Sequence, residues 1–138
     1  KENVPVIALE LKDGSIVYGK RSNLFSASAA MLLNATKKLA NIDHSIHLIS
    51  PSVIKPVQDL KVDVLKNANP KIRANEILVA LAIQASSNPL AELAISKLSE
   101  LQGCEAHSSS FMSPNDLNTL NKLGIHVTEE PTNFVSKN

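Results

Sequence analysis

The sequence predicts an α/β fold: a mixed, mostly parallel sheet of about five strands between two layers of helices. Three observations predict it. Four Ser-Pro or Asn-Pro dipeptides are of the kind that opens helices, β-rich runs lie between the expected helices, and Asp13-Gly14 is a strong hairpin signal. Strands separated by helices need crossover connections, which favour parallel pairing with helices on both faces. The expected architecture is a three-layer α/β/α sandwich that begins with a β-hairpin.

The expected strands are short apolar runs. The first two are joined at Asp13-Gly14, and the third is short and buried. In chain order the five runs are 4–11, 15–20, 46–49, 104–111 and 125–128.

The expected helices begin where a side-chain oxygen can cap the first turn. Apolar residues recur at three-four spacing over 22–40, with Ser22 or Ser26 as the cap. Pro56 lies beyond the first turn of the next helix and removes a backbone donor, so we expect a kink or a restart there. The later helices open at Ser50-Pro51, Asn69-Pro70, Asn88-Pro89 and Ser113-Pro114.

The length of 138 residues predicts a single domain over 1–131, with a tail at 132–138. Residue 1 is Lys rather than Met, so we expect a piece of a longer polypeptide, whose remainder is the expected partner. Cys104 is the one cysteine, which excludes an intrachain disulfide and favours the cytoplasm. The longest apolar run, 77–83, is far shorter than the ~20 residues that span a bilayer, so no membrane partner is expected.

Charge is distributed unevenly along the chain. The net charge is +1, but residues 1–73 carry 11 Lys/Arg against 6 Asp/Glu, and residues 74–138 carry 3 against 7. A basic half can bind an anionic partner, whereas two opposite halves can also neutralise each other across the fold. Nucleic acid is not an expected partner, because the aromatic residues lack the spacing of a stacking platform: Tyr18, Phe25, Phe111 and Phe134.

Two apparent motifs carry little chemistry. Gly14, Gly19 and Lys20 fit the spacing of a phosphate loop, but Arg21 stands where a metal-binding hydroxyl is needed. The histidines have no partner ligands at metal-binding spacing, so neither a metal nor another cofactor is expected. They are His44, His47, His107 and His126.

Cys104, Glu105 and His107 crowd together on one extended segment. Side chains alternate along a strand, so Cys104 and Ser108 face one side while Glu105 and His107 face the other. A Cys–His dyad is therefore disfavoured. Glu105 and His107 remain an acid/base candidate pair.

Several segments resemble the C-terminal domain of the bacterial uncharacterised protein family 0371. The resemblance is carried above all by Gly103-Cys104-Glu105-Ala106-His107-Ser108 and runs from about residue 4 to residue 131. It implies a domain of a several-hundred-residue protein of unassigned function, with a Gly-rich, phosphate-loop-like motif elsewhere in the family. The sequence departs from the expected pattern at three positions: Arg73 for His, Asn75 for Asp and Gln84 for Cys. Further matches lie at Asn69-Pro70-Lys71, Glu76-Ile77-Leu78, Asn88-Pro89 and Ala91-Glu92, and in 7–10, 26–30 and 47–51.

The element order is also similar to the cytidine-deaminase-like fold. That likeness places the zinc-ligand motifs of such enzymes at 26–28 and 51–55, where this chain has Ser and Lys and lacks the acid/base Glu. Zinc deaminase activity is therefore not expected. What would remain is an anion-binding hollow between two helix N-termini. Its candidate residues are Ser26, Ser28, Ser50, Ser52 and Lys55, although serines at such positions also serve simply as caps.

Three functional hypotheses follow. The first is an accessory or assembly domain that forms one wall of a phosphate or anion site. The second is an enzyme domain acting on a small phosphorylated substrate, with His107 and Glu105 as acid/base, helped by Glu76 or Arg73. The third is a nucleotide-sensing module. Association into a homo-oligomer also stays open.

Overall fold

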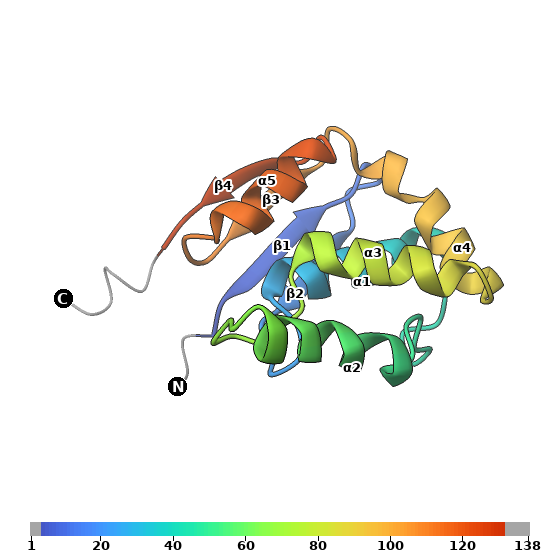
Figure 1. The fold of residues 1–138 in the computed structure, drawn as a ribbon. Coiled ribbons are helices and arrows are strands. Elements are labelled where there is room, and N and C mark those ends of the chain that lie inside the picture. The colour runs from blue at the N-terminus through green and yellow to red at the C-terminus, as the bar shows by residue number, and fades with distance from the viewer. Residues whose placement is uncertain (1–3, 132–138) are drawn as a thin grey trace.

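The computed structural model describes residues 4–131. The predicted tail at 132–138 lies outside the described residues. The chain forms an α/β fold with a four-stranded sheet and five α-helices in that part (Figure 1). The strands are β1 (Val6–Glu10), β2 (Ile16–Lys20), β3 (Glu105–Ser108) and β4 (His126–Glu129). The helices are α1 (Ala27–Ala40), α2 (Pro51–Asp59), α3 (Ala74–Ala85), α4 (Pro89–Ser96) and α5 (Pro114–Lys122), with a π-helical turn η1 (Leu60–Val64) and a 3-10 turn η2 (Leu98–Leu101).

Three of the predicted caps form the expected hydrogen bonds. Ser26 Oγ accepts from the Ala29 N–H, Asn88 Oδ1 from Leu90 and Ser113 Oγ from Asp116. Ser50 precedes α2 without such a bond. The helix continues through Pro56 and changes to π-helical geometry at Leu60, so the disturbance predicted at Pro56 comes one turn later.

The predicted helix start at Asn69-Pro70 is wrong, because α3 begins at Ala74. Asn69 Oδ1 accepts a hydrogen bond from the Lys71 N–H, which closes a local turn. Ile72 is buried and forms a parallel β-bridge with Phe25. This long-range pairing holds 70–73 in an extended conformation.

The sheet has the order β2-β1-β3-β4. β1 pairs antiparallel with both β2 and β3, and only β3 and β4 are parallel. A mixed sheet is confirmed, but the prediction of a mostly parallel one is wrong. The predicted strand at 46–49 is also absent: Leu48 and Ile49 are buried in a loop instead, where their side chains join the core without strand pairing.

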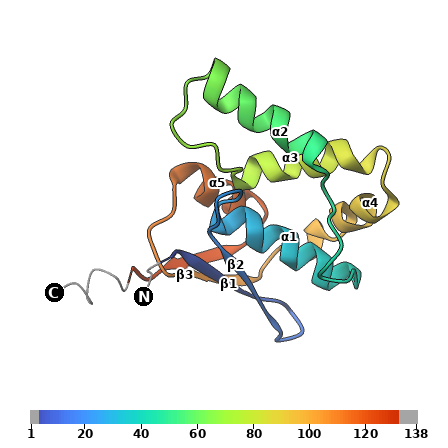
Figure 2. The same ribbon diagram turned by 90° about the horizontal axis from the view of Figure 1, so that it is seen from below.

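All five α-helices lie on one side of the sheet (Figure 2). α1 and α5 pack on its inner face, and α3 packs against both of them. Burial alternates accordingly: Ile7, Leu9 and Val17 are buried, while Ile16 and Tyr18 are exposed on the outer face. The helical layer predicted for the second face is therefore not formed by residues 4–131.

Within the part of the chain that the structure describes, every helix is too short or too polar to cross a bilayer. The same residues contain no group of three or more His, Cys, Asp or Glu side chains placed to hold a metal ion.

Candidate anion-binding site

Three helix N-termini meet on one side of the molecule, which is the left-hand side in Figure 1. The Ser26 N–H donates to Ile72 O (2.9 Å) and the Ile72 N–H donates to Leu24 O (2.8 Å), which ties the start of α1 to the segment before α3. The Ala74 N–H donates to Asp116 Oδ1 (2.9 Å), which ties α3 to α5. These bonds connect residues remote in sequence and fix the three starts together.

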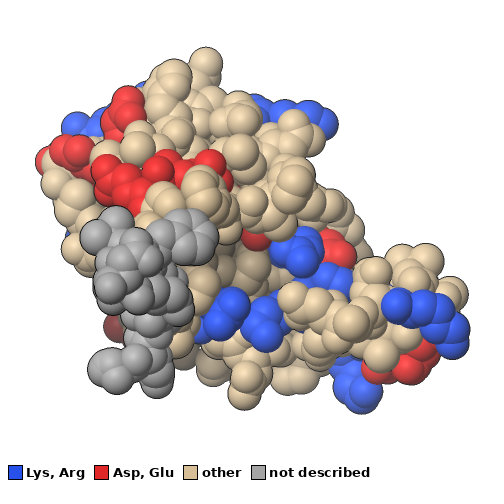
Figure 3. Space-filling model, turned by 90° about the vertical axis from the view of Figure 1, so that its left-hand side faces the viewer, with Lys and Arg blue, Asp and Glu red and all other residues tan. Residues whose placement is uncertain are grey.

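A cavity of about 170 Å³ lies at this junction, beside Ser108 at the carboxyl end of β3. In open α/β sheets, ligands bind beyond the carboxyl ends of parallel strands. Figure 3 views this side of the molecule and shows basic side chains gathered around a hollow. The lining side chains of this cavity are mostly polar and include Arg21, Ser26, Ser28, Asn69, Lys71, Arg73, Ser108, Ser110, Ser113 and Asp116.

Three basic side chains line the cavity, against one carboxylate. Three salt bridges form among the described residues, and none of them uses Arg21, Lys71 or Arg73. Each helix N-terminus adds a partial positive charge to the same place. The cavity therefore favours a negatively charged occupant.

Ser28 supplies the most specific feature of the cavity. Ser28 is only 1% exposed, yet its hydroxyl makes no hydrogen bond to any described residue. The backbone N–H groups of Ala27 and Ser28 belong to the first turn of α1, where intrahelical acceptors are missing. Ser26, by contrast, uses its hydroxyl to cap Ala29.

Asp116 is the acidic residue in this lining, and it is 4% exposed. Its Oδ1 is engaged by the Ala74 N–H, so the carboxylate caps α3 from a neighbouring helix. A bound anion would feel its charge as well as those of the three cations. The site is thus positive overall, with one built-in opposing charge.

Lys61 lies outside the cavity lining and holds the segment that precedes α3 in place. Its ammonium, on η1, donates to Lys71 O (2.6 Å) and to Glu76 Oε1 (2.8 Å). The same Glu76 oxygen accepts from the Arg73 N–H (2.8 Å). Together these bonds fix the backbone of the segment that carries Lys71 and Arg73 into the cavity.

Ser50, Ser52 and Lys55 lie elsewhere. α2 packs against α3, and Ser50 before its start lines a different cavity together with Asn34 and Lys37 of the second half of α1. Lys55 forms an exposed ion pair with Asp59 (3.0 Å). The fold does not form the predicted hollow shared by the starts of α1 and α2, and an anion-binding role of these three residues stays a prediction.

Glu105 and His107 lie on the outer face of β3, away from the helices, and line none of the described cavities. Cys104 is buried, and its thiol donates to Glu100 O. Burial raises the pKa of this thiol, which keeps it protonated and unreactive. An acid/base role of Glu105 and His107 stays a prediction.

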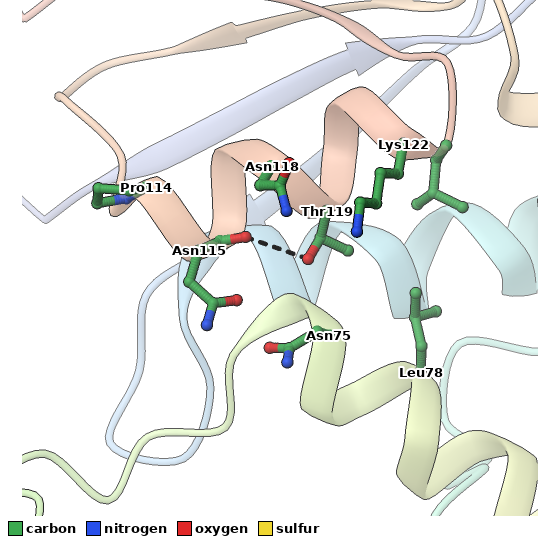
Figure 4. A pocket seen from close by; sticks show the side chains of 8 residues that line it. Asn75, Leu78, Pro114, Asn115, Asn118, Thr119 and Lys122 are labelled. Atoms are coloured by element: carbon green, nitrogen blue, oxygen red, sulfur yellow. Dashed lines mark hydrogen bonds between the residues drawn. The ribbon is translucent and has the colours of Figure 1, made fainter.

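The three positions expected to depart from the family pattern are also separated. Arg73 lines the anion cavity, whereas the Gln84 side chain accepts from the Ser50 N–H at the far end of α3. Eleven residues of helix separate them by about 16 Å. Asn75 faces a third cavity, of about 690 Å³, in which side chains of α5 such as Asn115, Asn118 and Lys122 converge (Figure 4).

The structure is that of an α/β domain with an open mixed sheet and all its helices on one face. Residues 1–138 match the family described as domain of unknown function DUF1846, C-terminal, and the chain belongs to this family. A UPF0371 protein of Streptococcus pneumoniae serotype 19F (strain G54) is 51% identical over 127 residues, covering 92% of this chain and 26% of the relative. A UPF0371 protein of Streptococcus uberis is 50% identical with the same coverage. The chain thus spans about a quarter of the length of these curated relatives, and the predicted family resemblance is confirmed. The likeness to the cytidine-deaminase-like fold stays a prediction.

Proposed function

We propose that this domain is an accessory part of a larger protein and supplies one wall of a phosphate-binding site. The site is the cavity between the starts of α1, α3 and α5, rather than one between α1 and α2. The accessory role is supported by the relatives, which are about four times as long as the matched region.

The observation that carries the proposal is the Ser28 hydroxyl. Every fully buried side-chain N or O atom among the described residues has a partner, so the unbonded Ser28 hydroxyl opens onto the cavity, where it is free to donate to a ligand. A phosphate oxygen accepts hydrogen bonds from hydroxyls and from helix N-terminal N–H groups alike. Arg73 and Arg21 add guanidinium groups, whose fork geometry suits phosphate.

The proposal predicts opposite effects of Ser28→Ala on binding and stability. Alanine removes a hydroxyl that makes no hydrogen bond within the protein and is the better helix former, so the free energy of unfolding is expected to stay equal or rise by a few tenths of a kcal/mol. Phosphate affinity is expected to fall about tenfold, as is typical of losing a hydrogen bond to a charged group. Urea unfolding and a phosphate titration followed by amide NMR shifts measure the two quantities.

Three further variants sharpen this test. Arg73→Gln is expected to weaken phosphate binding at least as much as Ser28→Ala, whereas Lys122→Gln, outside the cavity, leaves it unchanged. Asp116→Asn keeps an acceptor for the Ala74 N–H but removes the opposing charge, so it is expected to tighten binding. Equal effects of Arg73→Gln and Lys122→Gln would contradict the proposal, because they would indicate non-specific attraction.

A further inference from the structure

We infer that a second site, separate from the phosphate cavity, binds a small apolar carboxylate. The site is the cavity between α1, the 41–50 loop and the start of α2, with a volume of about 860 Å³. Pockets for small organic ligands fall within roughly 300–1,000 Å³ and are mostly apolar with a few placed polar groups. The apolar lining of this cavity includes Phe25, Ala30, Leu33, Leu48, Ile49 and Ile54.

The charged groups of this lining select for an anion. Lys37 lines the cavity with His44 and His47, and no carboxylate is among its lining residues. The nearby Asp43 does not line the cavity, and its carboxylate accepts hydrogen bonds from both the N–H and the hydroxyl of Ser45. A ligand carboxylate would therefore meet a cation without a competing acid in the wall.

Lys37 is held at the edge of the cavity. Its ammonium donates one hydrogen bond, to His44 O (3.1 Å), and it is in none of the salt bridges among the described residues. Its half-buried position lowers the pKa of Lys37 by desolvation, although Asp43 partly opposes this shift. A carboxylate brought in by an apolar body would compensate this desolvated charge.

A ligand of this cavity needs both an apolar chain and a carboxylate. The aliphatic chain would cover side chains that water now contacts, and the single negative charge would meet Lys37 at the mouth. Inorganic phosphate lacks the apolar part and is not expected to bind here, which separates this site from the first.

The test uses decanoate and decanol as probes of the 138-residue chain, followed by amide NMR shifts below micellar concentrations. Decanoate is expected to bind saturably, shifting residues 30–37 and 47–54, and at least about tenfold more tightly than decanol. Lys37→Met keeps the apolar stem and is expected to abolish that preference. Lys38→Met is the matched control and is expected to preserve it, because Lys38 lines a smaller neighbouring cavity and not this one.

A second variant tests the apolar part of the site. Ala30→Phe places a ring in the cavity and is expected to weaken both probes, with the fold checked by circular dichroism. If that variant fails to fold, the Lys37→Met result alone decides. Equal affinities for decanoate and decanol in the unmodified chain, or a preference that survives Lys37→Met, would overturn the inference, as would no binding of decanoate at all. None of these outcomes bears on phosphate binding at Arg73 and Ser28.

Discussion

Gly19→Ala is expected to lower the free energy of unfolding by more than about 3 kcal/mol, the upper range for overpacking a core contact. An added Cβ at Gly19 would lie 2.3 Å from Ala27 O and 2.3 Å from Met31 N, both backbone atoms of α1. A helix backbone cannot yield as a flexible side chain does. α1 would have to lift off β2 and expose the inner face of the sheet, where Val17 and Leu9 are buried.

Urea unfolding measures this effect, and Gly103→Ala is the matched control. Gly103 has a φ of +87° but open space around its Cβ position, so only backbone strain of about 1–2 kcal/mol is expected there. A Gly19→Ala variant as stable as Gly103→Ala would contradict the close approach of α1 to β2. Since α1 carries Ser28, a lifted helix would also weaken phosphate binding.

Lys61→Met is expected to destabilise the domain by about 2–3 kcal/mol. Breaking a fully buried ion pair costs about 3–5 kcal/mol, and the figure is reduced here because Glu76 keeps some contact with water. The Lys61 side chain is 5% exposed and Glu76 26% exposed. The variant leaves Lys71 O without its donor and Glu76 without its cation.

Lys55→Met is the control, because the Lys55–Asp59 pair is well exposed and worth at most about 0.5 kcal/mol. Chemical denaturation of both variants gives the comparison. Lys61→Met is further expected to weaken phosphate binding, since the segment that carries Arg73 loses its anchor. If Lys61→Met and Lys55→Met destabilise equally, Lys61 does not hold that segment.

Features fixed by near neighbours could be predicted from the sequence. The caps at Ser26, Asn88 and Ser113 each close a turn within three residues, and the Asp13-Gly14 hairpin is equally local. The predicted alternation of buried and exposed side chains along 104–108 is likewise confirmed, because it depends only on the geometry of one strand.

The candidate site could be predicted only in part. Ser26 and Ser28 became candidates through the likeness to the cytidine-deaminase-like fold, which places them at a helix start, but the segments that pack beside that start were not predicted. The hydrogen bond from the Ala74 N–H to Asp116 joins residues 42 positions apart, and no local sequence pattern predicts it. Asn69-Pro70 had the pattern of a helix opening, and the pairing of Ile72 with Phe25 overrode it. The same bridge, invisible in the sequence, brings Lys71 and Arg73 beside Ser28.

The proposed phosphate site requires that the starts of α1, α3 and α5 converge around an anion. Crystals of the chain soaked in selenate, in a lattice that leaves the cavity open, test this most directly through the anomalous signal of selenium. We predict a peak within hydrogen-bond reach of the Ser28 hydroxyl and the Arg73 guanidinium, which is lost in Arg73→Gln. An empty cavity in soaked crystals, or a peak that persists in Arg73→Gln, would contradict it.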